Sequence, residues 1–408
     1  MYNLDHMTVN EITRVPNKEF YQRRDKVKKV LEEQKVEGMV FFSASSIFYL
    51  TGSALLQTER PVIYVYRNDG ESALLVPTLE YEHTQLYTDN CKVYCYPEYP
   101  GERHPMHYLV DLLKEFKLDN KPLAADGNGA PAHWGYKGPK LTDLCPDLQL
   151  TLLPELINDL RIIKSDYEVS LLRESARWGH YTHILLQEYI RPGLSEIEVC
   201  MRTQADAAAV MLKALGPNYE LSGNDGIGLY ADIRGQVGPH SYYPHAANIN
   251  AIFKKGDSLV TGAGTWIFGY LTELERTLFV GEPSKEQEKY YKLAVEAQKA
   301  AYSMIKPGNR CCDVDRELMR FFKENDIMDC WRHHTGHSLG SVMHQRPFFD
   351  IGDETVLEPN MVLSGEPGIY VMGLGGFRCA DTVRITETGF EQLTHYTKDI
   401  DKLICSDH

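Results

Sequence analysis

The sequence predicts a two-domain protein in which a smaller α/β domain precedes a larger α+β domain. A chain of 408 residues is too long for one ordinary hydrophobic core, so two domains are expected from length alone. Strand-like and helix-like segments alternate in the first part of the chain. Longer helical patterns and a glycine-punctuated, strand-rich stretch follow them. We place the boundary so that the domains cover residues 1–158 and 159–408.

The first domain is expected to be α/β because its segments alternate in type. A charged helical pattern covers residues 20–34, and an amphipathic helix is expected at 106–116. Short apolar runs predict strands at 38–43, 61–66, 72–76, 92–96, 122–126 and 148–153. This order is typical of a sheet covered by helices.

The second domain is expected to begin with a long helix. Ser165 is a good N-cap and Glu168 follows three residues later, which is the pattern of a capping box. Further helices are predicted at 195–215, 285–305 and 314–325, and residues 356–403 are rich in strands and glycine turns. Helices packed on a curved antiparallel sheet are the expected α+β arrangement.

A predicted hairpin in the second domain carries two closely spaced carboxylates. Its β-rich arms, residues 258–260 and 276–280, flank a glycine-marked turn region. Glu273 and Glu275 are two residues apart, so on a strand they lie on the same face. Two like charges on a buried face need a cation opposite them. The alternative is a solvated strand edge with Arg276 as the partner.

Composition excludes several classes of partner. Lys and Arg number 43 and Asp and Glu 57, which gives a net charge of −14 without a long basic run. Nucleic acid and membrane surfaces are therefore not expected as partners. Residues 1–20 lack the apolar run of a signal peptide, and the nine cysteines form no C-x-x-C pair. A cytoplasmic protein with reduced thiols is expected.

Four clusters of side chains suggest chemistry in the second domain. A lone histidine is usually structural, but histidines beside carboxylates and glycine turns indicate metal binding or acid–base catalysis. The clusters are Pro244-His245, the pair Glu273 and Glu275, the segment 332–347 with His337 and His344, and the segment 357–381 with Glu366 and Arg378.

Several short motifs, taken together, resemble the M24 pita-bread family. They are Lys306-Pro-Gly308, Gly336-His337, Glu366-Pro-Gly368 and Asp381-Thr-Val383. The family includes Xaa-Pro aminopeptidase, prolidase, methionine aminopeptidase and creatinase. The resemblance spans nearly the whole chain. It implies a C-terminal pita-bread domain behind a smaller α/β domain, and usually a homodimer.

The resemblance also implies where metal ligands would lie. Peptidases of this family hold two metal ions with two Asp, one His and two Glu. These positions fall on Gly262, Glu273, His337, Glu366 and Ala380. Glycine and alanine have no ligand atom, so a two-metal site is not expected. A single divalent metal on Glu273, His337 and Glu366 is the alternative to a site with no cofactor.

The segment 274–279, Leu-Glu-Arg-Thr-Leu-Phe, is similar to that of creatinase, a metal-independent member that cleaves a C–N bond. Glu275 and Glu366 would suit a planar guanidinium or amidinium. The implied catalytic residues are His245, Glu275, Glu366 and His337, and the implied substrate-binding residues are Arg60, His344, Arg378 and Glu273. We therefore expect a metal-independent hydrolase of a C–N bond in a small guanidino, amidine or zwitterionic compound, without a cofactor.

The expected partners are a small-molecule substrate and a second copy of the chain, whose N-terminal domain would bring Arg60 into the active site.

Three other functions remain open. The first is an Xaa-Pro dipeptidase or aminopeptidase with one metal. The second is a pita-bread lyase acting on an osmolyte. The third is a non-catalytic pita-bread module that binds a partner protein.

Overall fold

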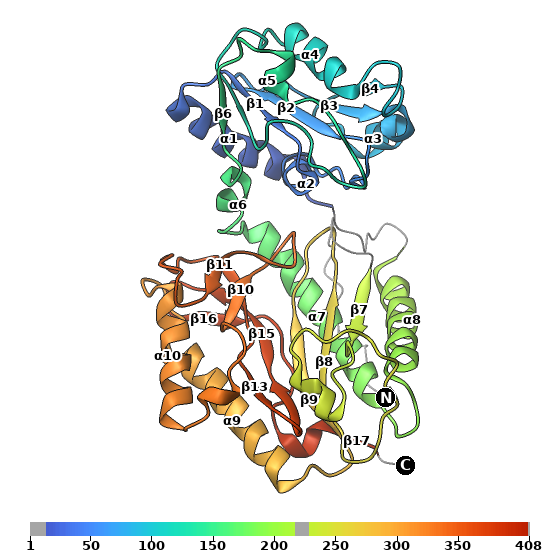
Figure 1. Ribbon diagram of the computed structural model, residues 1–408, viewed down its shortest axis with the longest axis vertical. Coiled ribbons are helices and arrows are strands. Elements are labelled where there is room, and N and C mark those ends of the chain that lie inside the picture. Colours follow the sequence, from blue (N-terminus) through green and yellow to red (C-terminus); the bar gives the residue numbers. More distant parts are fainter. Residues whose placement is uncertain (1–13, 217–227, 407–408) are drawn as a thin grey trace. The chain divides into compact units, whose positions relative to one another are not determined.

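The computed structural model describes residues 14–216 and 228–406 (Figure 1). Residues 1–13, which carry part of the expectation of no signal peptide, lie outside the described residues. The chain forms two compact units, Arg14–Arg161 and the part from Ile162 onward. Within the described ranges, every helix is too short or too polar to cross a lipid bilayer.

The N-terminal unit is a six-stranded mixed sheet with the order β4-β3-β2-β1-β5-β6. The β1–β2 and β2–β3 pairs are antiparallel and the others are parallel. Its strands are β1 (Gly38–Phe41), β2 (Ile63–Arg67), β3 (Ser72–Pro77), β4 (Lys92–Tyr96), β5 (Leu123–Ala125) and β6 (Leu150–Leu152). Its helices are α1 (Asn17–Gln34), α2 (Ala44–Thr51), η2 (Thr78–Glu80), α3 (Tyr81–Tyr87), α4 (Pro105–Glu115), α5 (Leu141–Leu144) and α6 (Leu156–Leu160).

Side-chain alternation in this sheet creates two separate cores. Met39 and Phe41 of β1 belong to the cluster that includes Leu31 of α1, whereas Val40 belongs to the cluster that includes Leu109 of α4. Because neighbouring residues of a strand point to opposite faces, helices cover both faces of the sheet. The α/β prediction for this part of the chain is confirmed.

The second unit is built on a nine-stranded sheet with the order β11-β10-β12-β15-β9-β8-β7, to which β16 adds on β15 and β17 on β9. Its strands are β7 (Leu229–Asp232), β8 (Ser258–Thr265), β9 (Leu274–Val280), β10 (Gly336–Ser338), β11 (Gln345–Phe349), β12 (Val362–Gly365), β15 (Ala380–Ile385), β16 (Phe390–Gln392) and β17 (Ile404–Cys405). The strands β13 (Gly368–Val371) and β14 (Gly375–Arg378) form a separate ribbon.

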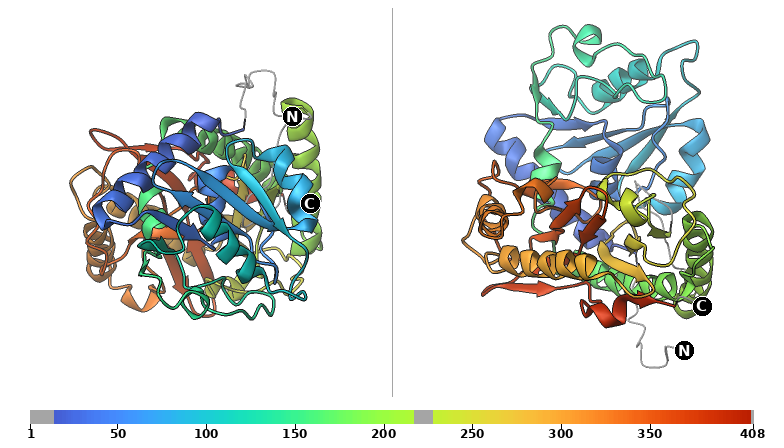
Figure 2. Two further views of the ribbon diagram at one scale, coloured as in Figure 1. Left: turned by 90° about the horizontal axis from the view of Figure 1, so that it is seen from above. Right: turned by 60° about the horizontal axis from the view of Figure 1, so that its bottom comes forward.

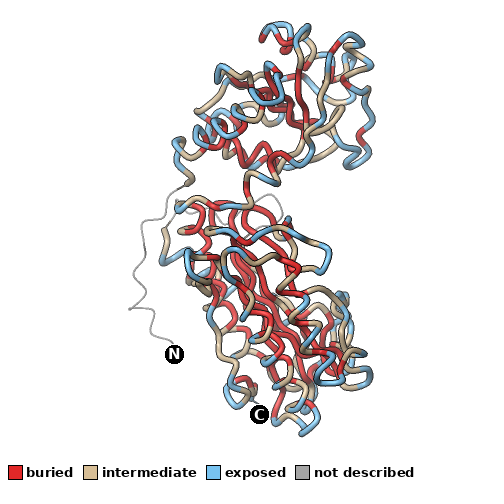
Figure 3. The backbone as a smooth tube through the Cα atoms, turned by 90° about the vertical axis from the view of Figure 1, so that its left-hand side faces the viewer, coloured by how far each residue is buried: buried red, intermediate tan, exposed pale blue. Residues whose placement is uncertain are grey.

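Four long helices lie along this sheet (Figures 1 and 2). They are α7 (Asp166–Tyr189), α8 (Glu196–Leu215), α9 (Lys285–Tyr302) and α10 (Cys311–Glu324), and short 3-10 turns occur at η3 (Gly238–Tyr242), η4 (Met328–Cys330) and η5 (Ile400–Leu403). All four helices contribute to one apolar cluster with Leu278 and Val280 of β9. Figure 3 shows that buried residues run through the interior of this unit. The predicted α+β class is confirmed.

Local sequence signals explain how α7 begins. The hydroxyl of Ser165 accepts a hydrogen bond from the Glu168 amide at 3.2 Å, and the Glu168 carboxylate accepts one from the Ser165 amide at 2.8 Å. The predicted capping box is therefore present.

The central hairpin is longer and more buried than the sequence suggests. Gly262 and Gly264 lie inside β8 rather than in the turn, and every residue of β8 and β9 is buried. A Cβ on Gly264 would meet the Tyr230 ring at 2.4 Å, so close packing explains this glycine. The alternative of a solvated strand edge at Glu275 is excluded.

The buried His183 predicts acid sensitivity of the folded state. Its Nε2 lies 3.0 Å from the Thr261 hydroxyl, and that hydroxyl donates to the Arg276 carbonyl. Nε2 of His183 is therefore the donor. Burial, together with nearby Arg276, lowers the pKa of His183 well below its ordinary value.

Because the unfolded state titrates near 6.5, stability is present above that pH and is lost as the pH falls through it. We expect unfolding by urea to show a loss of about 2 kcal/mol from this group between pH 7 and pH 5. The His183→Gln variant should lose less stability than the wild-type protein between pH 7 and pH 5. Equal losses in both proteins would contradict the assignment.

Candidate active site and metal centre

Three side chains from distant parts of the chain converge beside the hairpin. Glu273 directly precedes β9, His337 lies in β10, and Glu366 directly follows β12. Antiparallel pairing of β10 with β12 sets the last two side by side, since Gly336 pairs with Gly365. The Glu366 amide then donates to the Thr335 carbonyl at 2.8 Å, which fixes the chain where the carboxylate emerges.

The geometry of this cluster calls for a cation. Nε2 of His337 lies 3.4 Å from Oε2 of Glu273 and 3.4 Å from Oε1 of Glu366. Nδ1 of His337 must donate to the Ser338 carbonyl at 3.1 Å, so in the neutral ring Nε2 carries a lone pair. Among the described residues, neither Nε2 of His337 nor Oε2 of Glu273 has a hydrogen-bond partner. Two of the three acceptor atoms that face one another therefore lack a donor.

The pKa shifts of His337 and Glu366 also indicate that this cluster needs a positive charge. Burial lowers the pKa of His337, but the carboxylates of Glu273 and Glu366 outweigh it and raise that pKa well above its ordinary value. Burial raises the pKa of Glu366, yet the facing imidazole lowers it overall. A proton or a metal ion at this point satisfies all three groups.

The donor set fits a divalent metal ion. The candidate ligand atoms of Glu273, His337 and Glu366 all lie within 4.8 Å of one another. Two carboxylates and an imidazole nitrogen are ordinary ligands for zinc and similar ions. The positions of the two further ligands found in two-metal relatives are Gly262 on β8 and Ala380 on β15, which offer no side-chain donor.

A second polar group lies on the same face of the sheet. Nη2 of Arg378 donates to Oε1 of Glu275 at 2.6 Å, and Nη1 donates to the Tyr370 hydroxyl at 3.2 Å. Nη2 of Arg234 lies 3.5 Å from the same Oε1 of Glu275, and Nε of Arg234 lies 3.6 Å from Oδ2 of Asp232. Burial raises the pKa of Glu275 to about 8, although Arg378 acts in the opposite direction.

The contacts of Glu275 correct the expectation that Glu275 and Glu366 form a pair of carboxylates without a cation of their own. Glu275 and Glu366 were expected to grip an organic cation from the substrate. In the structure Glu275 already holds the guanidinium of Arg378. The positive charge required by a buried carboxylate is supplied from within the chain, so Glu275 has no need of a substrate cation.

The predicted histidines His344 and His245 are both exposed. The ring of His344 stacks on that of His337, with centroids 3.7 Å apart and planes at 17°. His245 follows η3. Desolvation and the facing His337 lower the pKa of His344. Both roles, catalytic for His245 and substrate-binding for His344, stay predictions.

Arg60 belongs to the N-terminal unit and is already paired there. Its Nε lies 2.6 Å from Oε1 of Glu98, and a second ion pair joins it to Glu59. Its predicted role in the active site of a second copy stays a prediction.

Sequence reasoning missed the residues that surround Glu275. Asp232 ends β7, and Arg234 lies two residues beyond it in a turn with a φ of 51°, so strand alternation does not relate the two side chains. Tyr370 closes the Glu366-Pro-Gly motif, and its hydroxyl lies 2.9 Å from Nε2 of His333. No local pattern in the sequence shows that Asp232, Arg234 and Tyr370 meet at Glu275.

The fold and the cluster define a two-part protein of the metallopeptidase type. The model of metallopeptidase family M24 matches residues 170–387, and the model of the creatinase/prolidase N-terminal domain matches residues 23–163. The chain belongs to metallopeptidase family M24, as the sequence motifs indicated.

Curated relatives match nearly the full length. The Bacillus subtilis (strain 168) protein YkvY, provisionally named a dipeptidase, is 27% identical over 379 residues, or 93% of this chain and 99% of that protein. An uncharacterized peptidase of Staphylococcus aureus (strain USA300) is 27% identical over 381 residues, or 91% of this chain and 99% of that protein.

Solved structures confirm the fold. The Xaa-Pro dipeptidase from Bacillus anthracis superimposes with a TM-score of 0.77 at 22% identity and covers 95% of this chain and 99% of its own. The prolidase from Pyrococcus furiosus gives a TM-score of 0.71 at 24% identity, with 91% and 99% covered. The predicted pita-bread domain behind a creatinase-type N-terminal domain is confirmed.

Two expectations are corrected by these findings. The prediction of a metal-independent hydrolase of guanidino or amidine compounds is wrong, because the family and the named relatives are peptidases. The expectation of no cofactor is also wrong, because the family is a metallopeptidase family and Glu273, His337 and Glu366 form a group suited to an ion. The missing ligands at Gly262 and Ala380 misled the prediction, since three remaining ligands are enough for one metal. In its coarser form, the expectation of a hydrolase holds.

Proposed function

We propose that this protein is a metal-dependent peptidase that hydrolyses short peptides, with Xaa-Pro dipeptides as the substrate class. The convergence of Glu273, His337 and Glu366, with partnerless acceptor atoms, inside an M24 domain carries this proposal. The provisional dipeptidase name of YkvY supports a short substrate. The Xaa-Pro dipeptidase from Bacillus anthracis supports the proline position.

Different side chains would have different roles in peptide hydrolysis. Glu273, His337 and Glu366 would hold one divalent ion, which when bound supplies Lewis-acid activation of water and of the peptide carbonyl. The carboxylate of Glu366, which faces the position of the ion, would accept a proton from the attacking water. The exposed imidazole of His245 would deliver a proton to the leaving nitrogen.

We also propose a homodimer in which Arg60 acts in the active site of the second copy, with no nucleic-acid or membrane partner. Light scattering of the purified protein tests the dimer. Loss of activity in Arg60→Ala without loss of folding tests the role of the arginine.

The decisive experiment measures dipeptide cleavage as a function of added metal. Protein freed of metal with a chelator is incubated with Ala-Pro, Met-Pro or Ala-Ala in the presence of Mn²⁺, Co²⁺ or Zn²⁺. We expect Ala-Pro and Met-Pro to release proline only when an ion is added, because the three ligands alone offer no Lewis acid. Creatine and ectoine serve as controls that should stay intact. Undiminished turnover in excess chelator, or no cleavage of any dipeptide, would overturn the proposal.

A further inference from the structure

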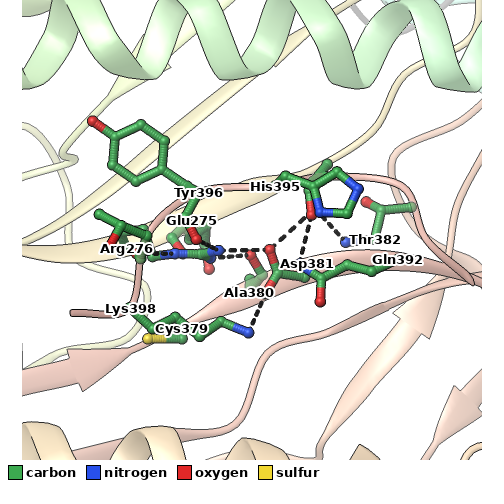
Figure 4. A network of polar contacts seen from close by, with 12 residues as sticks. Glu275, Arg276, Cys379, Ala380, Asp381, Thr382, Gln392, His395, Tyr396 and Lys398 are labelled. Atoms are coloured by element: carbon green, nitrogen blue, oxygen red, sulfur yellow. Dashed lines mark hydrogen bonds and ion pairs between the residues drawn. The ribbon is translucent and has the colours of Figure 1, made fainter.

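Glu275 is flanked on both neighbouring strands by residues that lack a functional side chain. It pairs with Gly262 on β8 and with Ala380 on β15, which lies beside it in Figure 4. A Cβ on Gly262 would lie 2.6 Å from Oδ1 of Asp232 and 3.8 Å from Cγ of Glu275. A carboxylate at position 262 would therefore require the Asp232 carboxylate to move aside.

The buried guanidinium of Arg378 is the cation that faces Glu275. Its residue is 2% exposed, and its backbone is fixed through Thr277, whose hydroxyl accepts from the Arg378 amide at 2.9 Å and donates to the Arg378 carbonyl at 3.1 Å. The hydrogen bonds to Glu275 and Tyr370 fix the other end. A side chain held at both ends cannot swing away to admit an ion without breaking these bonds.

Charge balance limits the number of metal ions that the site can hold. Glu273 and Glu366 also attract Arg378, so the two polar groups form one electrostatic unit. The carboxylates are Asp232, Glu273, Glu275 and Glu366, and the guanidiniums are those of Arg234 and Arg378. With neutral histidines this unit carries at most two negative charges, which one divalent ion neutralises. A second ion would leave an uncompensated double positive charge in a largely buried site.

We propose that the guanidinium of Arg378 takes the place of a second metal ion, so that the centre binds one divalent ion per chain. The inference rests on the metal centre of the proposed function but not on its peptide substrate. The two-metal arrangement does not fit this chain, because Gly262 and Ala380 supply no ligand and the Glu275–Arg378 pair closes the space beside them. The second positive charge of the centre is then the Arg378 guanidinium, which is part of the chain and stays in place when the metal is removed.

Counting bound manganese tests the proposal without an activity assay. Metal-free full-length protein is titrated with Mn²⁺, freed of excess ion, and analysed by inductively coupled plasma mass spectrometry and electron paramagnetic resonance. We expect one equivalent per chain and the spectrum of an isolated Mn²⁺. Two equivalents with the spectrum of a coupled pair would overturn the inference.

The failure of this inference is distinguishable from failure of the proposed function. No bound Mn²⁺ in the wild-type protein would overturn both the inference and the metal centre. One equivalent of Mn²⁺ in a protein that cleaves no dipeptide would support the inference and reject the peptide substrate.

A second set of variants tests the part played by Arg378. In the Gly262→Asp/Ala380→Glu protein, which regains both missing carboxylates, we expect still one equivalent of Mn²⁺ because the guanidinium remains. Adding Arg378→Ala should raise the count to two. Adding Arg384→Ala instead, which removes an arginine of the same strand as Ala380, should leave the count at one. A second ion bound with Arg378 in place would contradict its role, and circular dichroism verifies that each variant is folded.

Discussion

Replacing His337 by alanine is expected to abolish stoichiometric metal binding and to lower kcat/KM for dipeptide hydrolysis by about 10³-fold or more. The ring is fully buried, and its Nε2 is the only nitrogen in the cluster of three ligands. Without it, Glu273 and Glu366 are left facing each other with no group that separates their charges. A bound metal supplies several kcal/mol of transition-state stabilisation, and each 1.36 kcal/mol corresponds to a factor of ten.

The measurement pairs metal analysis with steady-state kinetics on Ala-Pro. His334→Ala is the matched control, because His334 belongs to the same segment but faces Asp350, with Nδ1 at 3.5 Å from Oδ2. We expect the control to keep its metal and its activity within a few-fold. Full metal occupancy in the His337→Ala protein would show that the ligands have been assigned wrongly.

Replacing Asp381 by alanine is expected to destabilise the folded protein by about 3–5 kcal/mol. Figure 4 shows why the change is costly. Nη2 of Arg276 donates to Oδ1 of Asp381 at 2.8 Å, and both side chains are completely buried. Nζ of Lys398 lies 2.8 Å from the other carboxylate oxygen. Removal of the carboxylate leaves the Arg276 guanidinium with backbone carbonyls as its partners and no negative charge.

Urea unfolding followed by circular dichroism measures this loss. Glu296→Ala provides the surface control, because Glu296 and Lys299 form an exposed ion pair that should be worth less than about 1 kcal/mol. The double variant Arg276→Met/Asp381→Leu should recover part of the loss, since it removes both charges together. If Asp381→Ala lowered the free energy of unfolding by less than 1 kcal/mol, the Arg276–Asp381 pair would stabilise the fold less than its burial indicates.

Local patterns predicted much of the fold and part of the site. The capping box at Ser165 starts α7 because it depends on residues only three apart. The two-residue spacing of Glu273 and Glu275 placed both on one face of the hairpin. The family motifs brought His337 and Glu366 to the same cluster, so the three metal-binding candidates were identified from the sequence.

The partners of these residues could not be found in the same way. Arg378 meets Glu275 across 103 positions of sequence, and Asp381 meets Arg276 across 105. A shift of one residue in the register of β9 against its neighbours would exchange the two faces and separate both pairs. Sequence spacing alone does not determine that register.

By itself the sequence determined the order of an α/β part and an α+β part, the family, and the loss of ligands at Gly262 and Ala380. These features depend on residue identity and on short-range periodicity, which a single chain displays directly. Only the tertiary structure decided that a guanidinium stands beside the remaining ligands. The charge at a buried site is the sum of groups brought together by strand pairing, and it decides whether a cation is still required there.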